Sequence, residues 1–211
     1  MIRLAVFDLD GTLVDSRLDL CLAVNHALRA LGLPERSLEE VSSFVGEGAA
    51  LLVERAVAPR VELREAALAA WWEHYQVHLL DHTVLYPGLR ELLAALPFPL
   101  AVHTNKPGRL ARRILEGLGV AERFVEVLGG DEAPRKPSPE GTRALLARRG
   151  VAPAEAVLVG DSLVDLALAR AVPLRFVAVG WGLVAPERLA AAGAPSPARS
   201  AAELAAALGA A

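Results

Sequence analysis

Two aspartates at a spacing of two, Asp8 and Asp10, are the first residues of this chain that could do chemistry. They follow an apolar run, residues 2–6, which is typical of a buried parallel strand. Both side chains should therefore point to the same side. Like charges this close repel each other unless a cation or a shared proton compensates, so the pair predicts either such a site or an ordinary Asp-Gly turn. Gly11 permits a tight turn, and Thr12 adds a hydroxyl.

The choice of basic residues adds a second signal. The chain has 22 lysines and arginines, and only two of them, Lys106 and Lys136, are lysines. Lysine is a compact charge on a flexible stem, whereas arginine is a planar fork. A site that places one ammonium against a phosphoryl oxygen or a carboxylate cannot readily use arginine. The alternative is that two lysines remain by chance.

Composition limits the class of protein. A chain of 211 residues that is 54% hydrophobic and 22% charged predicts one large domain, or a domain with an insertion, around a substantial core. A net charge of −3 without a basic cluster argues against nucleic acid as a partner. The apolar runs are too short for a membrane span, and a strand that begins near residue 2 leaves no room for a signal peptide. We expect a cytoplasmic monomer or homodimer with its lone cysteine, Cys21, packed in a core.

Strands and helices alternate after residue 83. Apolar runs predict strands at 98–103, 124–128, 156–159 and 175–179. Helices are expected at 87–96, from Pro107 to about 117, from a Ser138 cap to Gly150, at 162–171 and at the C-terminus. This alternation is typical of an α/β fold, here a Rossmann-like, doubly wound parallel sheet.

Residues 15–82 interrupt that rhythm because no convincing strand occurs there. Four helices are expected, at 16–31, in a short segment opened by a capping box at Ser37, at 49–57 and at 62–80. The prediction is a core made of residues 1–14 and 83–211, with residues 15–82 inserted as a helical cap. Such a module between the first two strands could form a lid over the strand ends.

Three histidines of the last cap helix, His74, His78 and His82, recur every four residues. On one helix face they could bind zinc. A solvated helix face is the favoured interpretation, because the spacing is common in helices. The neighbouring Trp71 and Trp72 are expected in packing, and His26 and His103 are expected to be structural.

Ligands of open parallel sheets bind at the carboxyl ends of the strands. Four such ends carry polar chemistry, and their carboxylates would suit a hard divalent cation such as Mg²⁺. A hydroxyl and two ammonium groups beside them would suit a tetrahedral dianion. The sequence therefore predicts a phosphoryl site built from Asp8, Asp10, Thr104, Asn105, Lys106, Lys136, Asp161 and Asp165.

These residues lie in four motifs, FDLDGTL, HTNKP, RKPSPE and VGDSLVD. In order and spacing the motifs resemble those of the haloacid dehalogenase superfamily of phosphatases, and the helical insert lies where that superfamily places its C1 cap. The segments FVGEGAALLVERAV, YPG and GGDE further resemble its phosphoglycolate phosphatase branch.

The resemblance implies roles for the site residues. Asp8 would be the nucleophile that forms an aspartyl-phosphate. Asp10 would be the general acid and base, and its backbone carbonyl would join Asp8 and Asp161 on Mg²⁺. Thr104 would hydrogen-bond a transferring oxygen. Lys136 would neutralise charge between Asp8 and the phosphoryl group.

Other roles are less determined. Asp165 would hold Lys136 or a metal-bound water, with Ser162 as a weaker site residue beside it. Asn105 and Lys106 border the site and could contact substrate, although Lys106 could instead supply charge at a helix start. Substrate selection is implied in the cap near Gly46, Glu47 and Gly48, where the alternative is an ordinary turn. Gly11 and Thr12 complete the expected substrate-binding set.

The function predicted is a Mg²⁺-dependent phosphomonoesterase that acts through an aspartyl-phosphate on a small phosphorylated metabolite, 2-phosphoglycolate first among them. A phosphosugar mutase of the same fold is an alternative, and it would need a bisphosphate primer. A non-enzymatic, receiver-like signalling domain is another, although its phosphoacceptor would lie at a later strand and no lid would be expected.

Overall fold

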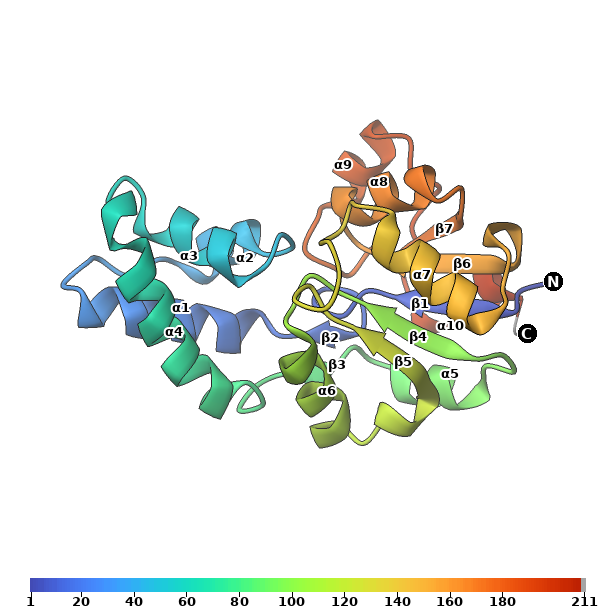
Figure 1. Ribbon diagram of the computed structural model, residues 1–211, viewed down its shortest axis with the longest axis horizontal. Coiled ribbons are helices and arrows are strands. Elements are labelled where there is room, and N and C mark those ends of the chain that lie inside the picture. The colour runs from blue at the N-terminus through green and yellow to red at the C-terminus, as the bar shows by residue number, and fades with distance from the viewer. Residues whose placement is uncertain (210–211) are drawn as a thin grey trace.

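A five-stranded parallel sheet forms the centre of the molecule (Figure 1). The computed structural model describes residues 1–209. The strand order is β5-β4-β1-β6-β7, so β1 is central and pairs with both β4 and β6. The strands are β1 (Leu4–Phe7), β4 (Leu100–His103), β5 (Phe124–Leu128), β6 (Ala156–Gly160) and β7 (Arg175–Ala178). This order brings the end of β1 beside the ends of β4 and β6.

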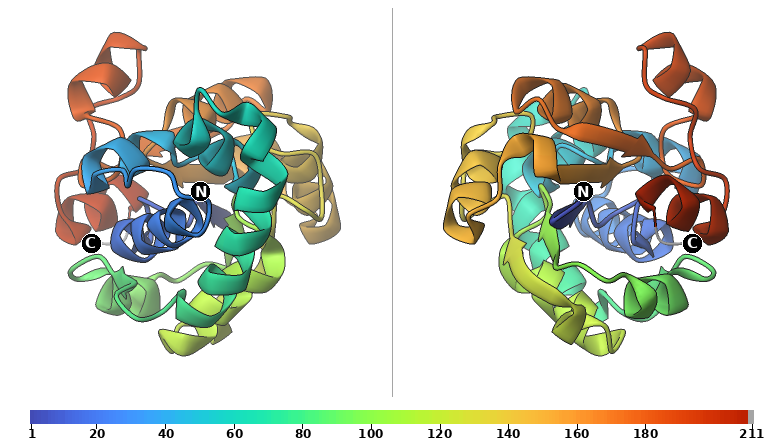
Figure 2. Two further views of the ribbon diagram at one scale, coloured as in Figure 1. Left: turned by 90° about the vertical axis from the view of Figure 1, so that its left-hand side faces the viewer. Right: turned by 90° about the vertical axis from the view of Figure 1, so that its right-hand side faces the viewer.

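Helices cover both faces of the sheet (Figure 2). Alternate strand residues point to opposite faces, so Phe7 and Val102 belong to one core cluster and Val6 and Leu158 to the other. The first face is covered by α5 (Leu89–Ala95), α6 (Gly108–Gly117) and α10 (Ala201–Leu208), the second by α7 (Glu140–Arg149), α8 (Leu163–Ala171) and α9 (Pro186–Ala191). The continuous apolar runs of the strands are explained by burial on both sides.

Four helices form an insert between β1 and β4, which lies beyond one end of the sheet (Figure 1). They are α1 (Arg17–Ala30), α2 (Leu38–Phe44), α3 (Ala49–Val57) and α4 (Arg64–His78). A two-stranded antiparallel ribbon, β2 (Val14–Asp15) with β3 (Val84–Leu85), joins the insert to the sheet. No helix within residues 1–209 is long and apolar enough to cross a membrane.

The predicted α/β fold is confirmed, and the expected strands lie within two residues of the observed ones. Two helix starts were wrong. Helix α5 begins at Leu89 because Gly88 adopts a left-handed turn (φ 76°), so Pro87 does not open it. Helix α7 begins at Glu140 after Pro139, and Ser138 bonds the side chain of Glu140 instead of capping the helix.

A short ribbon and one helix were not predicted, and part of the expected C-terminal helix lies outside the described residues. The β2–β3 ribbon was not predicted, because strands of two residues are too short to show a periodicity. Helix α9 was also missed. The expected C-terminal helix is present as α10, and residues 210 and 211 lie outside the described part of the chain.

A buried carboxylate fixes the junction between insert and sheet. Asp19 of α1 is only 1% exposed, and it accepts hydrogen bonds from the backbone N–H groups of His82 and Thr83 and from the Thr83 hydroxyl at 2.7–3.0 Å. These donors lie directly before β3. One side chain therefore ties the first insert helix to the segment that leads the chain back to the sheet.

We predict that Asp19→Ala lowers the free energy of unfolding by about 3 kcal/mol, because Thr83 would keep buried donors without an acceptor. For a chain of this size, that loss lowers the melting temperature by roughly 6–12 °C. Thermal denaturation followed by circular dichroism measures it. Asp81→Ala is the matched control, since Asp81 is exposed and its one ion pair within residues 1–209 is with the partly buried His78. Equal melting temperatures for the two variants would contradict the prediction.

Candidate functional site

A buried ammonium connects two carboxylates at the carboxyl end of the sheet. The Nζ of Lys136, in the loop between β5 and α7, lies 2.8 Å from Asp8 Oδ1 and 2.7 Å from Asp165 Oδ1. The Lys136 side chain is 1% exposed. Asp8 directly follows β1, and Asp165 lies in the first turn of α8. Three elements distant in sequence thus meet at one charge.

A third carboxylate, Asp161, directly follows β6 and is closely surrounded by two donors and two glycines. Its Oδ1 accepts a 2.7 Å hydrogen bond from the Thr12 hydroxyl, and its Oδ2 accepts one of 2.7 Å from the backbone N–H of Leu183. Gly11 has φ 84°, and a Cβ there would lie 2.4 Å from Asp161 Oδ2. At Gly182 a Cβ would lie 2.2 Å from the Cβ of Asp161. Both glycines are required by this close approach.

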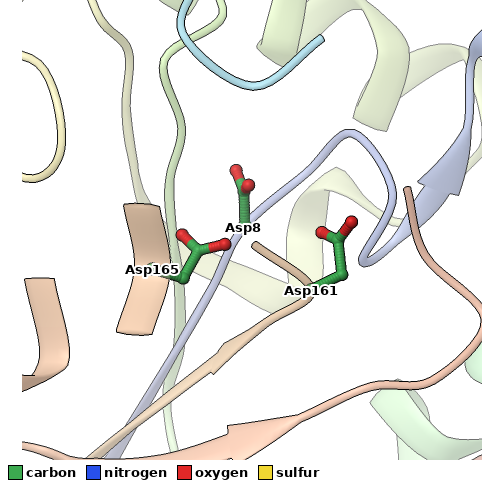
Figure 3. A group of neighbouring side chains, drawn as sticks. All are labelled: Asp8, Asp161 and Asp165. Carbon is green, nitrogen blue, oxygen red and sulfur yellow. The ribbon is translucent and has the colours of Figure 1, made fainter. Parts of the chain in front are cut away.

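The three carboxylates fit a hard divalent cation. One oxygen from each of Asp8, Asp161 and Asp165 lies within 4.8 Å of the others. Figure 3 shows the three side chains as neighbours. Within residues 1–209, Asp165 already uses both oxygens, one for Lys136 and the other for Ser162. Asp161 also accepts through both oxygens, but its donors are neutral, and no ammonium within the same residues pairs with it. Asp8 contacts Lys136 and the Leu9 N–H through Oδ1 alone. Asp8 and Asp161 are therefore the better ligands, and Asp165 positions Lys136.

Burial makes this group of carboxylates costly without a cation. Burial raises the pKa of Asp8 to about 6, although the Lys136 ammonium opposes the rise. Burial also raises the pKa of Asp161 to about 7, helped by the charges of Asp8 and Asp165. The pKa of Lys136 is raised by Asp165 and Asp8, against the effect of its burial. A divalent cation would offset the excess negative charge.

Asp10 lies outside the group of three and has its own cation. Both of its carboxylate oxygens accept hydrogen bonds from Lys106 Nζ, at 2.9 and 3.0 Å, and Ser16 donates to Oδ1 at 2.6 Å. Lys106 Nζ also lies 4.9 Å from the ring centre of Tyr75 in α4. The partner of Lys106 in this structure is Asp10, and a contact of Lys106 with substrate stays a prediction.

Asn105 connects the site to the insert. Its side-chain amide donates to the carbonyl oxygens of Gly46 at 3.0 Å and Lys136 at 3.1 Å, and its Oδ1 accepts from the Lys136 N–H at 2.8 Å. Gly46 lies between α2 and α3. One side chain therefore contacts both the insert and the backbone that carries the central ammonium.

A small cavity separates the strand ends from the insert. Asp8, Asp10 and Thr104 line it from the sheet, and Leu20, Val45, Leu52 and Trp71 line it from the insert. Lys106 is the only cationic residue of its lining in the described chain. The volume of the cavity is about 40 Å³. The insert therefore lies over the strand ends and leaves little free space between them.

The structure brings most of the predicted residues together. Seven of them line the cavity: Asp8, Asp10, Gly46, Gly48, Thr104, Asn105 and Lys106. Lys136, Asp161 and Asp165 do not line it and are grouped with Asp8. Gly11 and Thr12 surround Asp161 instead of the cavity. Glu47 is half exposed and pairs with Arg55, and Ser162 caps α8 through Asp165.

Some residues of the site had not been predicted. Ser16 and Tyr75 act through Asp10 and Lys106, and Leu183 contributes only a backbone N–H, which carries no sequence signal. The less favoured alternative, a zinc site at His74, His78 and His82, is not among the metal-ligand clusters of the described residues. In residues 1–209 the only cluster of three potential metal ligands is the aspartate group, and the ring of His74 stacks between those of His26 and His78.

Comparison with known proteins agrees with this geometry. Residues 5–179 match the family described as haloacid dehalogenase-like hydrolase. A phosphoglycolate phosphatase of Chromobacterium violaceum is 42% identical over 193 residues, 86% of each chain. The crystal structure of a predicted phosphoglycolate phosphatase from Haemophilus somnus has a TM-score of 0.82 and 34% identity over 86% of each chain. A predicted phosphatase from Clostridium acetobutylicum shares the fold, with a TM-score of 0.88 and 24% identity over 99% of this chain and 98% of its own.

We predict that Mg²⁺ raises the melting temperature more at about pH 8 than at about pH 5.5, because protons compete for Asp8 and Asp161. The raised pKa values mean that the metal-free fold binds extra protons, so its stability falls as pH rises from the unfolded value of 3.8 toward about 7. Mg²⁺ should restore the stability of the fold over that same pH range. Melting temperatures measured by thermal denaturation with and without Mg²⁺ at the two pH values test this prediction. Asp161→Asn should remove the difference, and equal stabilisation at both pH values would contradict the assignment.

Proposed function

The chain belongs to the haloacid dehalogenase-like hydrolase family, and from that premise we propose that it is a Mg²⁺-dependent phosphatase that uses Asp8 as its nucleophile and prefers 2-phosphoglycolate. One observation carries the chemistry. Lys136 and the Leu9 N–H both engage Asp8 Oδ1, so Oδ2 is the oxygen that remains free beside the cavity. The carboxylate is oriented by one oxygen and can react with the other.

In the first half of the reaction, Asp8 attacks the phosphorus of the substrate. A bond forms between the carboxylate oxygen and phosphorus, and the bond from phosphorus to the substrate's alcohol oxygen breaks. Asp10, which lines the same cavity two residues away, donates a proton to that leaving oxygen. Thr104 directs its hydroxyl hydrogen to a transferring oxygen, because its Oγ already accepts from the Lys106 N–H at 3.2 Å.

In the second half, water attacks the phosphorus of the aspartyl-phosphate. Asp10 accepts the proton of that water, and the bond between Asp8 and phosphorus breaks, so inorganic phosphate and the free carboxylate are released. Lys136 stays within reach of Asp8 and offsets the charge of the transferring group. Held by Asp8, Asp161 and the backbone carbonyl of Asp10, Mg²⁺ would supply electrostatic stabilisation of the phosphoryl oxygens.

The preference for a small acid rests on the cavity and on the relatives. The insert leaves little free volume, which excludes bulky or polymeric phosphates while it is closed. Helix α3 directs its first turn at the same cavity, because Gly48 and Ala49 line it and no side chain caps this helix end. Its free N–H groups favour an anion. The relative from Chromobacterium violaceum is named phosphoglycolate phosphatase.

We predict that Asp8→Asn abolishes turnover, since an amide cannot form the aspartyl-phosphate, while the fold is retained. Borohydride should reduce the aspartyl-phosphate formed during turnover to homoserine with release of phosphate, and peptide mass spectrometry should place that change at Asp8 of the wild type. The control is Asp10→Asn, which should also be severely impaired but should still show the change at Asp8. The change at another residue refutes the nucleophile.

We predict a higher kcat/KM for 2-phosphoglycolate than for hexose phosphates, nucleotides or pyrophosphate, because the closed cavity admits only small substrates. Initial rates of phosphate release over a panel of phosphomonoesters, with Mg²⁺ and with EDTA, measure both the preference and the metal requirement. A hexose phosphate that exceeds 2-phosphoglycolate tenfold would refute the substrate and leave the phosphatase standing. Full activity of dialysed enzyme in EDTA would refute the metal.

A further inference from the structure

We propose that Lys106 selects the substrate by exchanging partners: its ammonium leaves Asp10 and binds the anionic group at the far end of the substrate from the phosphate. The inference rests on the proposed function and names the residue that recognises the acid. The same exchange would free Asp10 for its part in the reaction.

The charges of the cavity support this assignment. Asp8, Asp10 and Lys106 are the charged side chains of its lining in residues 1–209, so a second anionic group on the substrate meets one available cation. Lys136 is already held between Asp8 and Asp165 at 2.8 and 2.7 Å, at the phosphoryl end. Burying a carboxylate without a cation or hydrogen-bond donors would cost free energy. Lys106 is the cationic side chain that can compensate its charge.

The surroundings of Lys106 suit movement over a short distance. Its side chain is 4% exposed, and its Nζ lies 4.9 Å from the ring centre of Tyr75, whose face attracts a cation. Tyr75 stacks on Trp71 with ring centres 4.7 Å apart. The ammonium can therefore turn toward the insert side of the cavity while it stays over an aromatic surface.

Trp71 provides an independent observation. It is 1% exposed and lines the cavity, yet its indole Nε1–H has no hydrogen-bond acceptor among the described residues. Buried indole N–H groups normally have one. A carboxylate that Lys106 draws to this side of the cavity would supply the missing acceptor. The same pocket thus offers one cation and one unused donor for the same ligand group.

The exchange also changes the contacts of Asp10. In the structure both of its oxygens accept from Lys106, and Ser16 donates to one of them. When Lys106 moves to the substrate, these oxygens are released from the ammonium and can face the leaving oxygen. A substrate without the second anionic group would leave Lys106 on Asp10 and react slowly.

The experiment compares 2-phosphoglycolate with 2-hydroxyethyl phosphate, in which an alcohol replaces the carboxylate. We expect wild-type enzyme to prefer the acid, and Lys106→Gln to reduce the ratio of the two kcat/KM values by about 10- to 100-fold, the value of a charge-assisted hydrogen bond. Glutamine still offers an N–H to Asp10. If Lys106 only positioned Asp10, the Lys106→Gln variant would therefore keep most of its activity toward both substrates. Equal loss for both substrates would overturn the proposal.

A second variant keeps the proposal testable if Lys106→Gln does not fold. Trp71→Phe keeps the aromatic ring and removes only the indole donor, and it should raise the KM for 2-phosphoglycolate about 3- to 10-fold without a matching rise for 2-hydroxyethyl phosphate. Thermal denaturation checks that both variants fold. If wild-type enzyme hydrolyses both esters equally well, selection by Lys106 is wrong while the phosphatase stands. If it hydrolyses neither, the proposed function is wrong as well.

Discussion

An ammonium ion that leaves water must find oxygen acceptors in the protein, and Lys136 finds them on two different elements. Asp8 follows the central strand β1, and Asp165 opens α8 beyond β6. Removing one member of such a buried set leaves a charge without compensation, which costs about 3–5 kcal/mol. The convergence of parallel strand ends makes this contact possible, and the contact in turn fixes which oxygen of Asp8 remains free. The strand order thus brings the two carboxylates together, and the Lys136 charge fixes the loop and the nucleophile against each other.

Closure of the insert is coupled to that same charge. Asn105 bonds both the carbonyl of Gly46 in the insert and the backbone of Lys136, while Lys106 lies between Asp10 and Tyr75 of α4. Away from the cavity, the insert is joined to the sheet by a ribbon of two short strands, which Asp19 stabilises. Two arginines of α6, Arg109 and Arg113, also bond Gln76 of α4. A module with two linkers and few polar contacts can move as a body about them. Each polar contact it makes at the cavity involves a group next to the reacting atoms, so an open insert leaves the site incompletely assembled.

The sequence was most informative where one residue type has one physical reason to be present. The alternation of apolar runs and helices predicted the sheet because buried parallel strands must be continuously apolar, and Asp8, Asp161 and Lys136 were predicted because they follow strand ends. Other contacts of the site could not be predicted from the sequence. The Leu183 N–H that holds Asp161 carries no side-chain signal, and the pairing of Lys106 with Asp10 joins residues 96 apart. Thr12 was expected at the substrate because a hydroxyl near Asp10 suggests it, whereas the fold turns it to Asp161.

The two lysines of an otherwise arginine-using chain have different physical explanations. Lys136 contacts single oxygens of two separate carboxylates at 1% exposure, a geometry for a point charge that a planar fork does not match. Lys106 instead contacts both oxygens of one carboxylate, which is the arrangement that arginine makes well. Geometry alone would therefore permit arginine beside Asp10. An arginine, however, would hold Asp10 through two parallel hydrogen bonds, more firmly than a flexible ammonium does. It would therefore exchange Asp10 for another partner less easily. A lysine at position 106 is consistent with a contact that has to be broken and remade in every turnover.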